Sequence, residues 1–290
     1  MRPSAQKSVI RLGWILLVVT SAWAFSPEAS PQTQGLVFEA VREHEKGNLD
    51  QALDLFRRAV AANPRHRFGT FARNQMALIL AKQGKIPEAL RVFEEVQGID
   101  LKNTFARLWA GILRLKQGEM DRAFVAFQEV TRIDSQNADA YYYMGAIYSF
   151  RRNRRMAIEF LKKARDANSD EATTHFRLAQ AFHNADMVEN ALLEYQRTLD
   201  LNPRYTKAMN SMGWIYYNRN QFDRAVGLWG KALRLNPKDR EARFNLAKAY
   251  NDAAWRRHQA GKRDEARRFW RKTLGVHPRN KAAKWNLKNL

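Results

Sequence analysis

The feature that most constrains this chain is a pattern of alanine residues that recurs about every 34 positions. Seven alanines fall in one register, with successive spacings of 37, 34, 34, 34, 34 and 41 residues. A large side chain follows each alanine by four positions, and a proline follows four of the alanines by twelve positions. A period of this length indicates one supersecondary unit repeated along the chain. The alanines are Ala52, Ala89, Ala123, Ala157, Ala191, Ala225 and Ala266.

Each unit has the pattern of two packed helices, because apolar positions recur at three and four residues within each half. A small residue, such as Gly145 or Gly213, lies twelve positions before the alanine and would let two helix backbones approach closely. Glycines such as Gly47 occur where a first helix must end, and a proline cannot continue the second helix. The last unit has seven extra residues before Ala266, about two helical turns, so its first helix can lengthen without losing phase.

These residues resemble the tetratricopeptide repeat, a 34-residue helical hairpin with small, alanine, aromatic and proline positions. The best single match is "NSMGWIYYNRNQFDRAVGLWGKALRLNP", Asn210 to Pro237. The resemblance covers roughly Thr33 to His277 and continues into a terminal helix from about Asn280. It implies an all-α, right-handed solenoid of about seven hairpins with a C-terminal capping helix, over residues 35–290.

The first 24 residues have the layout of a secretory signal peptide. Arg2, Lys7 and Arg11 precede an uncharged run, Leu12 to Phe25, which is shorter than the roughly 20 residues that span a bilayer. Residues 22–24 form a small-x-small cleavage pattern, and residues 25–34 are expected to be a flexible linker. We expect export to a bacterial periplasm or cell envelope. An uncleaved N-terminal anchor is the alternative.

Catalysis is not expected from this sequence. The chain has no cysteine, which excludes disulfides, a thiol nucleophile and thiolate metal sites. Its six histidines include one pair within a single expected helix, His175 and His183, whose separation of eight residues is too long to chelate one ion unaided. Phosphate-loop, HExxH and GxSxG patterns are absent. No catalytic residue, cofactor or metal site is therefore predicted.

The resemblance implies binding of a protein or peptide partner in a concave groove lined by the first helices. Aromatic side chains there would bury apolar groups of an extended peptide, and amides would bond its backbone. Packing of the flanking aromatics against the next repeat is the alternative. Carried onto this chain, the groove positions include Tyr142, Tyr143, Phe176, Arg177, Asn210, Trp214, Tyr217, Asn245 and Lys248.

The positive charge is concentrated near the C-terminus. Of the net charge of +21, Arg204 to Leu290 carries +16, and the densest part coincides with the seven-residue insertion. This cluster is interpreted either as a solubilising end cap or as a site for anionic lipid, acidic glycan or an acidic protein. Export and the lack of a nucleic-acid module disfavour nucleic acid. The cluster consists of Arg256, Arg257, Lys262, Arg263, Arg267, Arg268, Arg271 and Lys272.

The leading functional hypothesis is therefore a non-catalytic, exported scaffold that binds a protein segment in its groove. The alternative is an adaptor for polyanions or membrane surfaces that acts through the basic C-terminal region. The sequence does not distinguish oligomeric states.

Overall fold

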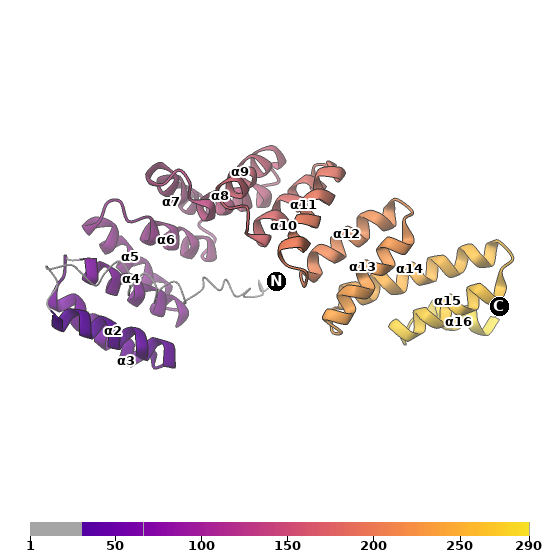
Figure 1. Ribbon diagram of the computed structural model, residues 1–290, viewed down its shortest axis with the longest axis horizontal. Helices are drawn as coiled ribbons and strands as arrows, with labels where there is room; N and C mark the ends of the chain where they lie inside the picture. Colours follow the sequence, from indigo (N-terminus) through magenta and orange to yellow (C-terminus); the bar gives the residue numbers. More distant parts are fainter. Residues whose placement is uncertain (1–30, 66, 290) are drawn as a thin grey trace. The chain divides into compact units, whose positions relative to one another are not determined.

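The computed structural model describes residues 31–65 and 67–289, and this part of the chain contains fifteen α-helices and no strand. The helices are joined by short turns and follow one another as hairpins (Figure 1). The predicted signal segment, residues 1–24, lies outside the described residues. Within the described part, no helix combines the length and the apolar character that crossing a membrane requires.

The described part of the chain divides into two compact units, of which the first ends at Glu129 and the second begins at Val130. In the first unit α2 pairs with α3 and α4 with α5, and α6 then packs on α5. The boundary between the units falls inside α7. The helices of this part are α2 (Pro31–Lys46), α3 (Leu49–Ala62), α4 (Arg67–Lys82), α5 (Ile86–Ile99), α6 (Thr104–Lys116) and α7 (Met120–Ile133).

The second unit contains four hairpins, α8–α9, α10–α11, α12–α13 and α14–α15, and α16 packs on α15. In chain order these four pairs follow α2–α3, α4–α5 and α6–α7, so the described residues contain the seven helix pairs and the terminal helix that the repeat pattern predicts. The helices are α8 (Ala138–Phe150), α9 (Arg154–Ala167), α10 (Ala172–Asn184), α11 (Val188–Leu201), α12 (Thr206–Asn218), α13 (Phe222–Leu235), α14 (Arg240–Gln259), α15 (Arg263–Val276) and α16 (Lys281–Asn289).

The predicted repeat register is confirmed by burial. The seven repeat alanines and the seven large residues that follow them are at most 1% exposed. A β-carbon added to Gly213 would lie 2.5 Å from Nε1 of Trp229, closer than real β-carbon contacts. The small residue is therefore needed because the large one fills the space beside it. The large residues are Phe56, Phe93, Phe127, Leu161, Tyr195, Trp229 and Trp270.

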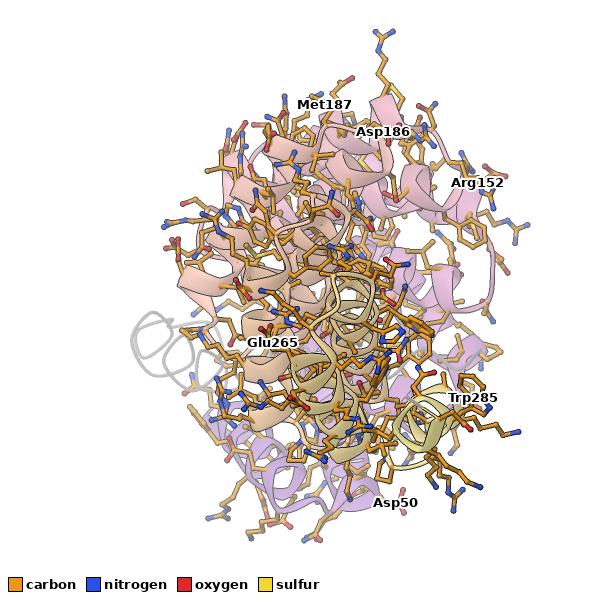
Figure 2. All side chains as sticks on the ribbon, turned by 90° about the vertical axis from the view of Figure 1, so that its right-hand side faces the viewer. Asp50, Arg152, Asp186, Met187, Glu265 and Trp285 are labelled. Atoms are coloured by element: carbon orange, nitrogen blue, oxygen red, sulfur yellow. The ribbon has the colours of Figure 1, made fainter. Side chains whose placement is uncertain are left out.

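The turn inside each hairpin uses a left-handed residue at the same repeat position. In four hairpins this residue is a glycine. In the other three it is a residue with a β-carbon, for which a positive φ is less favourable than for glycine. Figure 2 labels two of these, Arg152 and Asp186, at the tips of their hairpins. The φ angles are 88° at Gly47, 83° at Gly84, 84° at Gly118, 58° at Arg152, 59° at Asp186, 59° at Asn220 and 76° at Gly261.

The first described helix, α2, begins inside the segment that was predicted to be a flexible linker. Residues 25–34 were expected to be flexible, but α2 starts at Pro31. Thr33 is fully buried and accepts a hydrogen bond of 2.8 Å from the amide of Asn63, which ties the start of α2 to the end of α3. Proline is well suited to a first helical turn because its fixed φ is helical. The rest of the predicted linker, residues 25–30, lies outside the described residues.

Candidate functional site on the second unit

The predicted groove residues lie on the first helices of four successive hairpins, α8, α10, α12 and α14. Besides its hairpin partner, α8 also contacts α10, and α12 also contacts α14. The first helices therefore form a layer of their own. We call the exposed side of this layer the inner face of the second unit.

Trp214 and Tyr217 form the aromatic centre of the inner face. Both are half-buried, and their rings meet edge to face with centroids 5.4 Å apart. The ring of Trp214 is also 5.9 Å from that of the buried Trp229, which supports it from below. On the neighbouring helix α14, Phe244 is 60% exposed. The two helices thus present apolar ring surface that the fold itself leaves partly uncovered.

A polar network borders these rings. The ammonium of Lys248 donates to the hydroxyl of Tyr217 at 2.9 Å and to Oδ2 of Asp252 at 3.0 Å. The hydroxyl of Tyr217 also donates to the carboxylate of Asp252. The hydrogen bonds to Tyr217 and then to Asp252 raise the pKa of Lys248, so it keeps its charge. Sequence reasoning missed Asp252, although its position four residues after Lys248 is a common helical pairing distance.

Tyr142, Tyr143 and Arg177 form a second group on α8 and α10. The two tyrosine rings meet edge to face with centroids 5.3 Å apart. Nε of the exposed Arg177 donates to the hydroxyl of Tyr142 at 3.4 Å. Burial first, and then the nearby Asp139, raises the pKa of Tyr143 to about 12, which keeps this phenol neutral.

Three of the nine predicted groove residues are buried and do not offer groove surface, contrary to expectation. Phe176 is 5% exposed, because its ring packs against Tyr195 and Tyr205 at 5.8 and 4.9 Å. Asn210 is 2% exposed, and its amide donates to Asp239, the residue that caps α14. Asn245 is also 2% exposed.

The other six groove residues are accessible, and their role in binding stays a prediction. They are Tyr142, Tyr143, Arg177, Trp214, Tyr217 and Lys248.

The basic cluster lies on the lengthened last hairpin. Helix α14 has 20 residues, whereas α8, α10 and α12 have 13 each, so the predicted in-phase lengthening by seven residues is confirmed. Arg256 and Arg257 lie in the added part of α14, and the other six cations lie at the start of α15 or along it. Glu265 neutralises part of the cluster, since it pairs with Arg257 at 3.1 Å and with Lys262 at 3.7 Å.

The cations on α15 lie opposite its buried residues. Ala266, Trp270 and Thr273 face the core, while Arg267, Arg268, Arg271 and Lys272 are exposed on the other side. The structure therefore gathers these four charges on one solvent face. Figure 2, which looks onto this end of the chain, shows many nitrogen-tipped side chains around α14 to α16.

One histidine takes part in a buried charged cluster rather than in a metal site. His175 is 4% exposed, and its Nδ1 lies 2.6 Å from Oε2 of Glu194 while its Nε2 lies 3.0 Å from the carbonyl of Ser169. Oε1 of Glu194 accepts a bond of 2.9 Å from Arg165. This cluster links α9, α10 and α11. In the part of the chain that the structure describes, no group of three metal-ligating side chains comes together.

The comparisons with known proteins point to one family. The family described as "TPR repeat" matches residues 213–252, and the family described as "Tetratricopeptide repeat-like domain" matches residues 28–144. Photosystem I assembly protein Ycf3 of Synechococcus sp. (strain CC9311) is 32% identical over 82 residues, which are 23% of this chain and 47% of that protein. Tetratricopeptide repeat protein 6 of Homo sapiens is 36% identical over 59 residues, 20% of this chain and 11% of that protein. The chain thus spans less than half the length of these curated relatives.

Solved structures share the fold at low sequence identity. The C-terminal part of a TPR repeat-containing protein from Cytophaga hutchinsonii is 17% identical, covers 87% of this chain and 99% of its own, and has a TM-score of 0.68. YrrB, described as a TPR protein with an unusual peptide-binding site, is 19% identical, covers 64% of this chain and 95% of its own, and has a TM-score of 0.52. At such identities the likeness concerns the fold alone.

Proposed function

This chain is a tetratricopeptide repeat protein, and we propose that it is a non-catalytic scaffold that binds an extended segment of a protein partner on the inner face of its second unit. The observation that carries this proposal is the partly uncovered aromatic surface of Trp214, Tyr217 and Phe244. YrrB, a neighbour of this fold, is described as having a peptide-binding site, and Ycf3 is described as an assembly protein.

The chemistry of the inner face suits an extended peptide. Trp214 and Tyr217 are already held against other rings, so ordering them costs little conformational entropy on binding. Aromatic side chains with a polar end are the commonest energetic anchors of protein interfaces. The ammonium of Lys248 lies beside Tyr217 and the guanidinium of Arg177 beside Tyr142, and both groups would donate hydrogen bonds to carbonyl or carboxylate oxygens of the partner.

Trp214→Ala is expected to weaken capture of the partner by at least about tenfold, because it removes the central anchor of the inner face. A photoreactive amino acid at the exposed Asn218 of α12 should crosslink the partner in cell-envelope fractions, whereas one at Lys231 on α13 should not. Mass spectrometry then identifies the captured protein. Phe244→Ser should also reduce crosslinking, and because Phe244 is 60% exposed this change leaves the fold intact.

Leu193→Ala is the matched control for this experiment, since Leu193 is an exposed apolar residue on the second helix α11. It should leave crosslinking unchanged. Equal crosslinking from Asn218 and Lys231, or full crosslinking by both Trp214→Ala and Phe244→Ser, would contradict binding on the inner face.

A second candidate function is favoured by the exposed cations on one face of α15. This face would attract anionic lipid headgroups or acidic glycans through screened Coulomb interactions. Changing Arg267, Arg268 and Arg271 to Glu is expected to abolish cosedimentation with phosphatidylglycerol vesicles at low salt. The unchanged protein should itself lose most of this binding at physiological salt, where charges are screened over about 8 Å. Cosedimentation that survives the charge reversal would leave α15 as a solubilising cap.

We place the scaffold outside the cytoplasm, on the basis of the cleavable-signal pattern in residues 1–24. The mature chain is expected to begin near Phe25 in periplasmic extracts. N-terminal sequencing of exported protein checks this. A full-length chain that begins at Met1 and stays in the membrane pellet would support the uncleaved anchor instead.

A further inference from the structure

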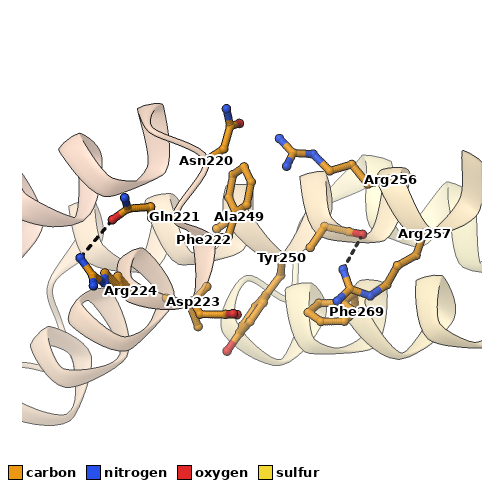
Figure 3. A pocket seen from close by; sticks show the side chains of 12 residues that line it. Asn220, Gln221, Phe222, Asp223, Arg224, Ala249, Tyr250, Arg256, Arg257 and Phe269 are labelled. Atoms are coloured by element: carbon orange, nitrogen blue, oxygen red, sulfur yellow. Dashed lines mark hydrogen bonds between the residues drawn. The ribbon is translucent and has the colours of Figure 1, made fainter. Parts of the chain in front are cut away.

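A cavity of about 440 Å³ lies between the turn that joins α12 to α13 and the lengthened hairpin α14–α15. Phe222 and Asp223 of α13 line it from one hairpin, and Tyr250 and Arg256 of α14 line it from the next (Figure 3). Its volume falls within the range of about 300–1,000 Å³ that is typical of small-ligand sites. The inner-face residues Trp214 and Lys248 do not line it.

The cavity follows from the seven extra residues of α14. In the preceding hairpin the first helix ends at Asn218 and the chain turns back at once into α13. Helix α14 is about two turns longer than α12. Its last part therefore extends past the level at which α12 ends and has no part of α12 beside it. Arg256 and Arg257 lie on this last part. Where the long hairpin lies next to the shorter one, side chains of the last part of α14 therefore lie over the turn between α12 and α13.

Three arginines line this cavity, and Arg256 is the one without a side-chain hydrogen bond or ion pair among the described residues, since Arg224 donates to Oε1 of Gln221 at 3.2 Å. Its guanidinium carbon lies 3.9 Å from the centroid of the Phe222 ring. A guanidinium stacked on a ring keeps its N–H groups directed outward in its own plane, where they can hold a carboxylate in bidentate fashion. Arg257, by contrast, already bonds Glu265 at 3.1 Å and the carbonyl of Ala253 at 3.2 Å.

Asp223 supplies an opposite charge to the same cavity. It is exposed and makes no hydrogen bond or ion pair within the described residues. A ligand that offers only negative charge would leave this carboxylate without a hydrogen-bond donor. A peptide segment meets both requirements, because an acidic side chain can pair with Arg256 while a backbone N–H donates to Asp223. The rings of Phe222 and Tyr250 provide apolar surface for a neighbouring side chain.

We infer that this cavity is a second peptide-binding site, which takes an acidic residue flanked by apolar residues from a protein partner. Arg256 holds the carboxylate, Asp223 accepts a backbone N–H next to it, and the aromatic walls contact the flanking side chain. The site shares no lining residue with the inner face, although the ring of Phe222 lies 5.5 Å from that of Tyr217, and its ligand is tested independently of the binding proposed there.

The probe for this site is the tripeptide acetyl-Leu-Glu-Leu-amide, titrated into the ¹⁵N-labelled full chain. We expect it to shift the backbone amide resonances of residues around Phe222, Tyr250 and Ala253 at millimolar concentration. Its twin acetyl-Leu-Gln-Leu-amide should bind at least about tenfold more weakly, because the charge-assisted pair with Arg256 is lost. Phosphatidylglycerol vesicles should not displace the bound tripeptide.

Arg256→Met keeps the apolar stem but removes the charge, and it should weaken binding of the glutamate tripeptide at least about tenfold. Arg267→Met is the matched control on the outer face of α15 and should have no effect. Asp223→Ala should weaken binding several-fold, whereas it would strengthen binding if Asp223 only repelled the ligand. Circular dichroism verifies that each variant folds.

Equal binding of the two tripeptides, or unchanged binding by Arg256→Met, would overturn the site. So would displacement of the tripeptide by vesicles, which would assign Arg256 to lipid binding. Trp214→Ala should leave tripeptide binding unchanged, and Arg256→Met should leave inner-face crosslinking unchanged. These two variants separate a failure of this site from a failure of the inner face.

Discussion

Replacing Trp229 with alanine is expected to lower the free energy of unfolding by about 3–5 kcal/mol. Trp229 is 1% exposed and fills the space between α12 and α13, where its Nε1 donates to the carbonyl of Asn210. Its removal leaves a cavity that the surrounding helices cannot fully close. Urea unfolding measures the loss, and hydrogen exchange in α12 and α13 locates it, because repeat arrays can unfold in parts.

A double-mutant cycle with Gly213 makes this prediction sharper. Gly213→Ala alone should destabilise the protein by about 1–3 kcal/mol, since the new β-carbon would lie 2.5 Å from Nε1 of Trp229. In the Trp229→Ala background the collision partner is gone. The same change should then stabilise the helix by up to about 1 kcal/mol, the usual preference for alanine over glycine. Equal effects of Gly213→Ala in both backgrounds would show that the two residues do not meet.

Glu194→Ala is expected to lower the free energy of unfolding by about 3–5 kcal/mol. Glu194 is 6% exposed and joins His175 of α10 to Arg165 of α9. Nδ1 of His175 lies 2.6 Å from Oε2 of Glu194, and Arg165 donates to the other carboxylate oxygen at 2.9 Å. Loss of the carboxylate would leave the buried ring nitrogen without its hydrogen-bond partner. Urea unfolding measures the change.

Glu189→Ala on the same helix is the control. Its ion pair with Arg219 is as short, at 2.7 Å, but the Glu189 side chain is 77% exposed. Exposed pairs contribute little to stability because water and salt screen them, so this variant should unfold almost like the original protein. Similar losses for Glu194→Ala and Glu189→Ala would mean that burial does not govern the strength of these pairs.

Much of the fold could be predicted because the repeat signal is local. The spacing of Gly213, Ala225 and Trp229 recurs in unit after unit, and each set meets within one hairpin. Glu43 is an acidic residue at a repeat position that is usually apolar, and its hydrogen-bond partners are also local. Its carboxylate accepts bonds from Lys46 at 2.6 Å and Asn48 at 2.7 Å, and both lie within five residues along the chain.

The candidate site could be predicted only in part. Helical spacing places Phe176, Asn210 and Trp214 on one side of their helices, but spacing does not reveal how much of that side the next hairpin covers. Phe176 is covered by Tyr205 of the following repeat, and Asn210 is held by Asp239 of the following repeat, whereas Trp214 keeps part of its surface. Contacts between repeats depend on side chains about 30 residues apart in the chain, which the period does not encode.

The sequence by itself determined the hairpins, their register and the lengthening of α14, because each of these depends on residues within one repeat. Only the tertiary structure decided which side chains remain exposed and which charges meet. The buried cluster of Glu194, His175 and Arg165 joins three helices, and the cavity beside Arg256 exists because a long hairpin lies next to a short one. Both arise where neighbouring repeats pack, since burial and charge pairing are properties of two surfaces in contact rather than of one helix.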